Sequence, residues 1–172
     1  MTGDLRWARH LEAARGYLML ELPDLALDEL RRVGAPEGLR FEVARLTGEA
    51  LRQKEQHEAA LDAFLAAADE QPDDLSVLMG MAWCFKRTGR LPRAIECMER
   101  AYRACPDEPI VLYNLACYHA LAEDKPQALA WLGRAIRMER SLRNLIPEET
   151  DFDRLRNDPD FQFIVEAGAA KE

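Results

Sequence analysis

Cysteines are the first residues of this chain that could carry out chemistry or bind a metal ion. The four cysteines lie at positions 84, 97, 105 and 117, and no two of them form a C-x-x-C pair. Zinc sites and intracellular redox centres usually depend on such close pairs. The spacing therefore predicts small, buried or half-buried thiols in a reducing compartment.

The three histidines, His10, His57 and His119, are equally isolated, and none belongs to an H-E-x-x-H motif. His119 follows Cys117 by two residues, and such neighbours on a helix do not share a face. We therefore expect His119 to pack rather than to catalyse. The sequence also lacks a Gly-rich phosphate loop and a G-x-S-x-G motif. It predicts no enzyme and no cofactor, with cysteine and histidine chemistry as the remaining enzymatic alternative.

Acidic residues gather in the pairs Glu148-Glu149 and Asp151-Asp153. Paired carboxylates can bind a cation, but this spacing does not match an EF-hand loop. We expect these side chains to lie in a loop and at a helix N-terminus, in solvated or capping roles. A weak cation site is the alternative, and no metal site is predicted.

The cysteines, histidines and acidic residues named above must be positioned by helices, and the helical pattern recurs at a fixed interval along the sequence. Residues 75–106 contain two stretches with apolar residues at helical spacing, separated by Thr88-Gly89. Glycine ends a helix readily because it accepts the left-handed backbone just beyond the last turn. A single short helix hairpin cannot cover its own apolar face, so this unit needs neighbours on both sides.

A step of 34 residues aligns small and large apolar residues along the chain. Small residues suit the points where two helices cross closely, and larger ones fill the space between successive hairpins. The four aligned sets, called columns here, are Ala14, Gly48, Ala82 and Ala116; Ala26, Ala60, Ala94 and Ala128; Leu30, Phe64, Met98 and Leu132; and Val33, Ala67, Ala101 and Ala135.

The period and the columns resemble the tetratricopeptide repeat (TPR), a 34-residue helix–turn–helix family. The resemblance implies an all-α fold, a right-handed α-α superhelical solenoid of helix hairpins with C-terminal capping helices. We expect a single domain over residues 1–172, with repeats at about 5–38, 39–72, 73–106 and 107–140. The first repeat departs from the family pattern, because Pro36 comes before its expected end.

After about residue 140 the repeat pattern stops. Asp158-Pro159 is typical of a helix N-terminus. An open stack of hairpins must cover its last apolar face, and we assign this role to Phe152, Leu155, Phe161 and Ile164. Residues 141–172 are thus predicted to form a cap, and they resemble the closing region of bacterial TPR proteins.

Composition argues against several classes of function. No apolar run approaches the roughly 20 residues that span a bilayer, and the N-terminus lacks the apolar core of a signal peptide. We therefore predict a cytoplasmic protein without membrane insertion. A net charge of −8 argues against nucleic acid as the main partner. The excess of 19 arginines over 4 lysines points to a GC-rich, bacterial genome.

In TPR proteins, the first helices of the hairpins line a concave groove that holds a peptide or a partner segment. By column, the resemblance places Met79, Trp83 and Tyr113 on an apolar and aromatic floor. Basic residues are expected beside this floor: Arg45, Arg52, Lys86 and Arg87. Asn114 is the only asparagine on a predicted inner helix, so the asparagine set that grips chaperone C-termini is missing.

Aromatic residues and arginine often dominate binding energy. The sequence therefore favours a non-enzymatic interaction module or adaptor whose partner is a protein or peptide with apolar and acidic residues. One alternative is a self-associating scaffold, a homo-oligomer without a dedicated peptide ligand. Another is that Trp83 only packs against a neighbouring helix while the arginines beside it are solvated.

Overall fold

The structure is a computed structural model that describes residues 2–34 and 36–166, with side chains placed from Arg6 onward. Every regular element in these ranges is helical, and no strand occurs in them. The all-α fold that the sequence predicts is therefore confirmed. No helix within the described ranges is both long and apolar enough to cross a bilayer. Residues 167–172 of the predicted cap lie outside the described residues.

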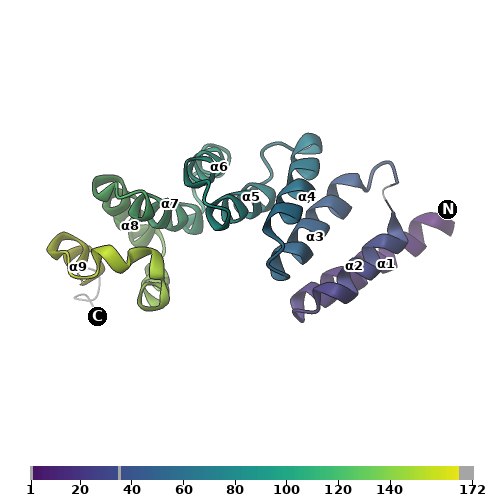
Figure 1. Cartoon of the computed structure of the whole chain (residues 1–172), viewed down its shortest axis with the longest axis horizontal. Coiled ribbons are helices and arrows are strands. Elements are labelled where there is room, and N and C mark those ends of the chain that lie inside the picture. The colour runs from purple at the N-terminus through teal and green to yellow at the C-terminus, as the bar shows by residue number, and fades with distance from the viewer. Residues whose placement is uncertain (1, 35, 167–172) are drawn as a thin grey trace. The chain divides into compact units, whose positions relative to one another are not determined.

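The chain divides into two compact units, an N-terminal unit of residues 1–90 and a C-terminal unit of residues 91–172. In the N-terminal unit, α1 (Thr2–Met19) pairs with α2 (Pro23–Val33), and α3 (Arg40–Gln53) pairs with α4 (His57–Glu70). The next helix, α5 (Leu75–Arg87), packs against α4 and also contacts α3, and α3 in turn contacts α1 (Figure 1). The first helices of these successive hairpins therefore lie side by side.

One residue in the left-handed region lies in each of the four turns that follow residues 19, 53, 87 and 121. These residues are 34 positions apart in sequence, with φ angles of 55° at Glu21, 58° at Glu55, 77° at Gly89 and 61° at Glu123. Glycine was expected in this role only at position 89, and three turns use glutamate despite its steric cost. Asp74 caps the N-terminus of α5, because its carboxylate accepts a hydrogen bond from the Val77 N–H at 3.0 Å.

The C-terminal unit contains α6 (Leu91–Ala104), α7 (Pro109–Leu121) and α8 (Lys125–Met138). Two 3₁₀ helices follow, η1 (Arg140–Glu148) and η2 (Thr150–Leu155), and then α9 (Pro159–Glu166). The segment η2 packs on α7, while η1 and α9 pack on α8 (Figure 1). Phe152 and Phe161 are buried with their ring centroids 5.4 Å apart. The predicted C-terminal cap is thus confirmed, and Asp158 caps α9 as expected.

Side chains of all four columns are buried, from Ala14 at the start to Ala135 at the end. Close packing in the N-terminal unit surrounds Phe64 on α4, which is 2% exposed. Its ring lies against Gly48 of α3 and Gly80 of α5. A Cβ atom at Gly48 would lie 2.7 Å from the ring, and one at Gly80 would lie 2.4 Å from it. The phenyl ring therefore occupies the space that both glycines leave open.

Gly80→Ala tests this close approach. Since the added methyl group must displace a buried ring, we expect the free energy of unfolding to fall by about 1–3 kcal/mol. Gly16→Ala is the matched control, because nothing lies within 4 Å of a Cβ at that helical glycine. Alanine should stabilise the helix there by about 0.5–1 kcal/mol. Urea denaturation measures both changes, and a Gly80→Ala protein as stable as wild type would contradict the packing.

Candidate binding site around Trp83

Trp83 lies half-buried on α5, and two arginines approach its ring. The guanidinium carbon of Arg52, from α3, is 5.1 Å from the ring centroid. The corresponding carbon of Arg87, from the end of α5, is 5.6 Å away. Cations at such distances are attracted to the electron-rich face of an indole. The structure therefore brings together three of the residues that the sequence predicts for partner binding.

A histidine that was not predicted for this site completes the surroundings of Trp83. His57, the first residue of α4, lies with its ring centroid 5.0 Å from the indole in an edge-on arrangement of 76°. This geometry is favourable for aromatic pairs. With neighbours from α3, α4 and its own helix, the indole is held in one orientation while part of it stays exposed to solvent.

The arginine on α3 forms an ion pair of its own. Arg52 donates from Nε to Glu49 Oε2 at 2.9 Å and from Nη2 to Glu49 Oε1 at 2.5 Å. The hydrogen bond with Glu49 raises the pKa of Arg52, against the opposing effect of burial. This two-point contact fixes the plane of the guanidinium beside the indole and neutralises its charge within the protein.

Arg45, two helical turns before Arg52 on α3, is neutralised in the same way. Its Nη2 donates to Glu42 Oε1 at 2.7 Å, and Arg15 Nη2 from α1 donates to the same oxygen at 2.8 Å. Burial favours the neutral form of Glu42, but the hydrogen bonds from Arg45 and Arg15 outweigh it, and the pKa of Glu42 lies below its ordinary value. The carboxylate therefore links α1 to α3.

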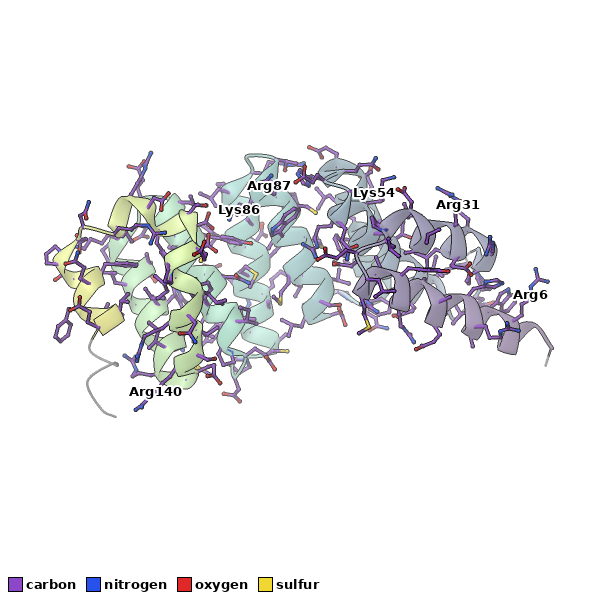
Figure 2. All side chains as sticks on the ribbon, turned by 90° about the horizontal axis from the view of Figure 1, so that it is seen from below. Arg6, Arg31, Lys54, Lys86, Arg87 and Arg140 are labelled. Carbon is purple, nitrogen blue, oxygen red and sulfur yellow. The ribbon has the colours of Figure 1, made fainter. Side chains whose placement is uncertain are left out.

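The predicted basic patch consequently carries less free charge than its composition indicates. Glu42 and Glu49 each lie three residues before the arginine that they bind, a spacing that places two side chains on one helix face. Lys86 is half-buried, whereas Arg87 is exposed. Within the described ranges, Arg87 forms no ion pair. Figure 2 labels Arg87, the last residue of α5.

A surface depression of about 460 Å³ lies next to Trp83. Gln53 helps to shape it, since its Nε2 donates to the Leu18 carbonyl of α1 at 3.0 Å. The volume falls in the range of sites that take small molecules or single side chains. The residues that line the depression are Glu21, Pro23, Arg52, Gln53, Glu55 and Trp83.

The other predicted site residues have different surroundings. Met79 is half-buried one helical turn before Trp83. Tyr113 is 2% exposed in the C-terminal unit, with its ring centroid 5.8 Å from that of Phe152. It belongs to the core beneath η2 rather than to an open floor, and Asn114 beside it on α7 is half-buried. The role of these residues in binding stays a prediction.

Two of the four cysteines, Cys84 and Cys97, do not have the surroundings of reactive nucleophiles. None of the four forms a disulfide, and three of them are buried, as the sequence predicts. Burial raises the pKa of Cys84 and of Cys97 to about 11. These two groups are therefore thiols at neutral pH, whereas a nucleophilic cysteine needs a lowered pKa. His119 has a side chain only 13% exposed and lies 3.7 Å from Asp124, in agreement with a packing role.

Comparison with known sequences gives a match over much of the chain. A sequence profile described as "Tetratricopeptide repeat" matches residues 45–109 and 80–141. Together these two matches span more than half of the protein. No functionally curated protein matches the sequence.

Solved structures titled MamA resemble this one. The "Crystal structure of MamA" has 17% sequence identity and a TM-score of 0.71, over 78% of this chain and 79% of that one. MamA AMB-1 has 13% identity and a TM-score of 0.73, over 98% and 95%. MamA from Desulfovibrio magneticus RS-1, from residue 41 to its end, has 14% identity and a TM-score of 0.73, over 97% of both chains. At such identities the likeness concerns the fold alone.

Glu42→Gln tests the ion pairs behind the site. We expect the free energy of unfolding to fall by about 1–2 kcal/mol at pH 7, because two arginines lose a charged acceptor. Since the folded-state pKa of Glu42 lies below the ordinary value of 4.5, its contribution is full above that pH and is lost as the pH falls through the folded-state pKa.

The difference between wild type and Glu42→Gln should therefore shrink between pH 7 and pH 3 in urea denaturation. Glu37→Gln, at an exposed position, is the control and should stay within about 0.5 kcal/mol of wild type. Equal destabilisation by Glu42→Gln at both pH values would show that the charge of Glu42 is not responsible.

Proposed function

Because this chain belongs to the tetratricopeptide repeat family, we propose that it is a binding module that holds a peptide or a segment of a partner protein against Trp83. The family fold supports a role in protein–protein interaction or scaffolding. The proposal that Trp83 is the point of contact rests on one observation. Its half-buried indole is held in one orientation by Arg52, Arg87 and His57.

An oriented indole favours binding for two physical reasons. Tryptophan buries a large apolar area when a ligand covers it, and residues of this type frequently dominate interface energies. Its orientation is already restricted by its neighbours, so little side-chain entropy is lost on binding. An apolar or aromatic ligand side chain would pack on the exposed part of the Trp83 indole, and Met79 would extend the apolar contact along α5.

The guanidinium of Arg87 indicates which charged group the proposed ligand carries. This guanidinium lies near the indole, is exposed and has no ion-pair partner among the residues placed by the structure. A carboxylate can accept two parallel hydrogen bonds from a guanidinium. We therefore propose that the ligand carries an acidic residue close to its apolar anchor. Arg52 acts in this proposal by orienting the indole, since Glu49 already neutralises its charge.

The remaining predicted residues have supporting roles in this proposal. Arg45 and Lys86 extend the surface along α3 and α5. In the C-terminal unit, Tyr113 supports α7 from the core, and Asn114 offers a polar contact on the same helix. We also propose that residues 1–172 act together as a single TPR domain, in the cytoplasm.

Trp83→Ala tests the proposal directly. A peptide selected by the wild-type protein from a random display library serves as the probe, and its affinity is measured by fluorescence anisotropy. Removing the anchor should weaken binding by about 2 kcal/mol, roughly 30-fold in Kd. Arg87→Gln should weaken binding of the same peptide less and reduce its dependence on salt.

Trp131→Ala is the matched control for Trp83→Ala. Trp131 is also half-buried, and Arg134 also lies over its ring, at 4.6 Å, but it belongs to the C-terminal unit. The control should bind the peptide as wild type does. Unchanged affinity in a folded Trp83→Ala protein, with circular dichroism like that of wild type, would rule out the anchor role.

Self-association is the second candidate function, and one surface favours it. The turn between α1 and α2 exposes Met19 by 86% and Leu20 by 68%, with Leu22 and Leu25 exposed by 43% and 44% close by. Contiguous exposed apolar side chains of this kind often mark protein interfaces. A second copy of the chain covering this turn would remove them from water.

Sedimentation velocity separates the two candidates. If the scaffold reading holds, wild type should form a concentration-dependent oligomer, and Leu20→Glu should shift it to monomer by placing a charge in the apolar contact. Glu12→Gln, at an exposed position of α1, should leave the oligomer unchanged. A wild-type protein that stays monomeric at all concentrations would exclude self-association through this turn.

A further inference from the structure

A surface depression in the C-terminal unit lies between η1 and α9. Its volume is about 270 Å³, slightly below the range of roughly 300–1,000 Å³ that is usual for small-molecule sites. Most of its lining is apolar and comes from Ile146, Pro147, Phe161 and Val165. Ile146 and Phe161 are buried. The depression therefore suits an apolar group of modest size.

Arg143 of η1 also lines the depression, and its surroundings indicate the kind of ligand. The side chain is half-buried, and its Nε is shielded from water without a hydrogen-bond acceptor in the described part of the chain. Arg143 also forms no ion pair with any residue that the structure describes. A shielded donor that belongs to a charged group is costly when it has no acceptor. The guanidinium therefore favours an anion from outside the chain.

The other charged residues of the depression do not neutralise Arg143. Arg156 donates from Nε to the Asp153 carboxylate at 2.8 Å and from Nη2 to the Glu149 carbonyl at 2.9 Å. These hydrogen bonds pair Arg156 within the protein and hold the backbone that follows η1. Glu166, the last residue of α9, is exposed and forms no ion pair with a described residue. The charge of Glu166 is therefore solvated, and Arg143 keeps an unpaired positive charge beside an apolar surface.

We propose that this depression binds a carboxylate attached to an apolar group, either a short free fatty acid or the C-terminal residue of a polypeptide. The carboxylate binds the guanidinium of Arg143, whose planar donors match its two oxygens. The apolar part packs on Phe161 and Val165. One unpaired guanidinium balances one negative charge, which favours a monocarboxylate over a phosphate group that carries nearly two.

Titration of the whole chain with hexanoate tests the proposal, independently of the site proposed at Trp83. Isothermal titration calorimetry should give a Kd on the order of 1 mM, because so small a ligand has few atoms in contact with the protein. Hexanamide has the same size without the charge, and acetate has the charge without the long apolar chain. Each should bind at least about 10-fold more weakly than hexanoate.

The tripeptide Gly-Gly-Leu with a free carboxylate distinguishes the two sources of the ligand, and its C-terminal amide is the control without the charge. Tighter binding of hexanoate than of the tripeptide would assign the site to free acids. Tighter binding of the tripeptide, lost in its amide, would assign it to the end of a polypeptide. Either result supports the proposal.

Variants assign the binding to Arg143. Arg143→Gln removes the charge, so it should weaken hexanoate binding at least about 10-fold. Arg143→Lys keeps the charge but loses the planar pair of donors, and it should weaken binding less. Arg140→Gln is the matched control, because Arg140 is an exposed arginine of the same 3₁₀ helix that does not line the depression. It should bind hexanoate as wild type does.

Two results would overturn the proposal: no saturable binding of hexanoate or Gly-Gly-Leu to wild type at millimolar concentrations, or wild-type affinity in a folded Arg143→Gln protein. If Arg143→Gln does not fold, nuclear magnetic resonance of the arginine Nε–H groups in wild type decides. The Arg143 resonance should shift with saturation during the hexanoate titration, while that of Arg140 stays in place. An unchanged Arg143 resonance would contradict the site.

Discussion

The close approach of helices at glycine and alanine is the constraint on which this structure depends. In the N-terminal unit, the ring of Phe64 fills the space beside Gly48 and Gly80, where any side chain would collide with it. Ridges of large residues can enter grooves on a neighbouring helix only where the facing positions are small. The candidate site follows from this packing, because it brings α3 and α5 together and lets residues of both surround Trp83.

Ion pairs within the protein then determine which charges near Trp83 are not already neutralised. Glu42 and Glu49 neutralise the arginines of α3 and fix their side chains. Isolated surface ion pairs contribute little to stability, but Glu42 is only 19% exposed and binds arginines from two helices. In the proposed function, the remaining selectivity near Trp83 comes from the indole and from Arg87. An acidic protein can in this way present a local site for an acidic ligand.

Periodicity was sufficient to predict the fold. The buried columns, the helix pairs, the left-handed turn at Gly89 and the N-cap at Asp74 all follow from residue type and spacing. The left-handed backbone at Glu21, Glu55 and Glu123 did not, because glutamate has no preference for it, although Glu55 lies one repeat length before Gly89 and Glu123 one repeat length after it.

The site was harder to predict than the fold, because its details depend on contacts between elements. The charge patch was overestimated, since the ion pairs with Glu42 and Glu49 depend on side chains that had no assigned role. Tyr113 was expected on an open floor, but η2 covers it.

The central claim is that packing at small residues presents Trp83 as the anchor of a binding surface. The chain contains three tryptophans, Trp7, Trp83 and Trp131, which lie in different surroundings. Nuclear magnetic resonance of their indole N–H groups during titration with a selected peptide tests the claim most directly. The account predicts that the Trp83 resonance shifts with saturation while those of Trp7 and Trp131 stay in place. A shift of either other indole with Trp83 unchanged would contradict it.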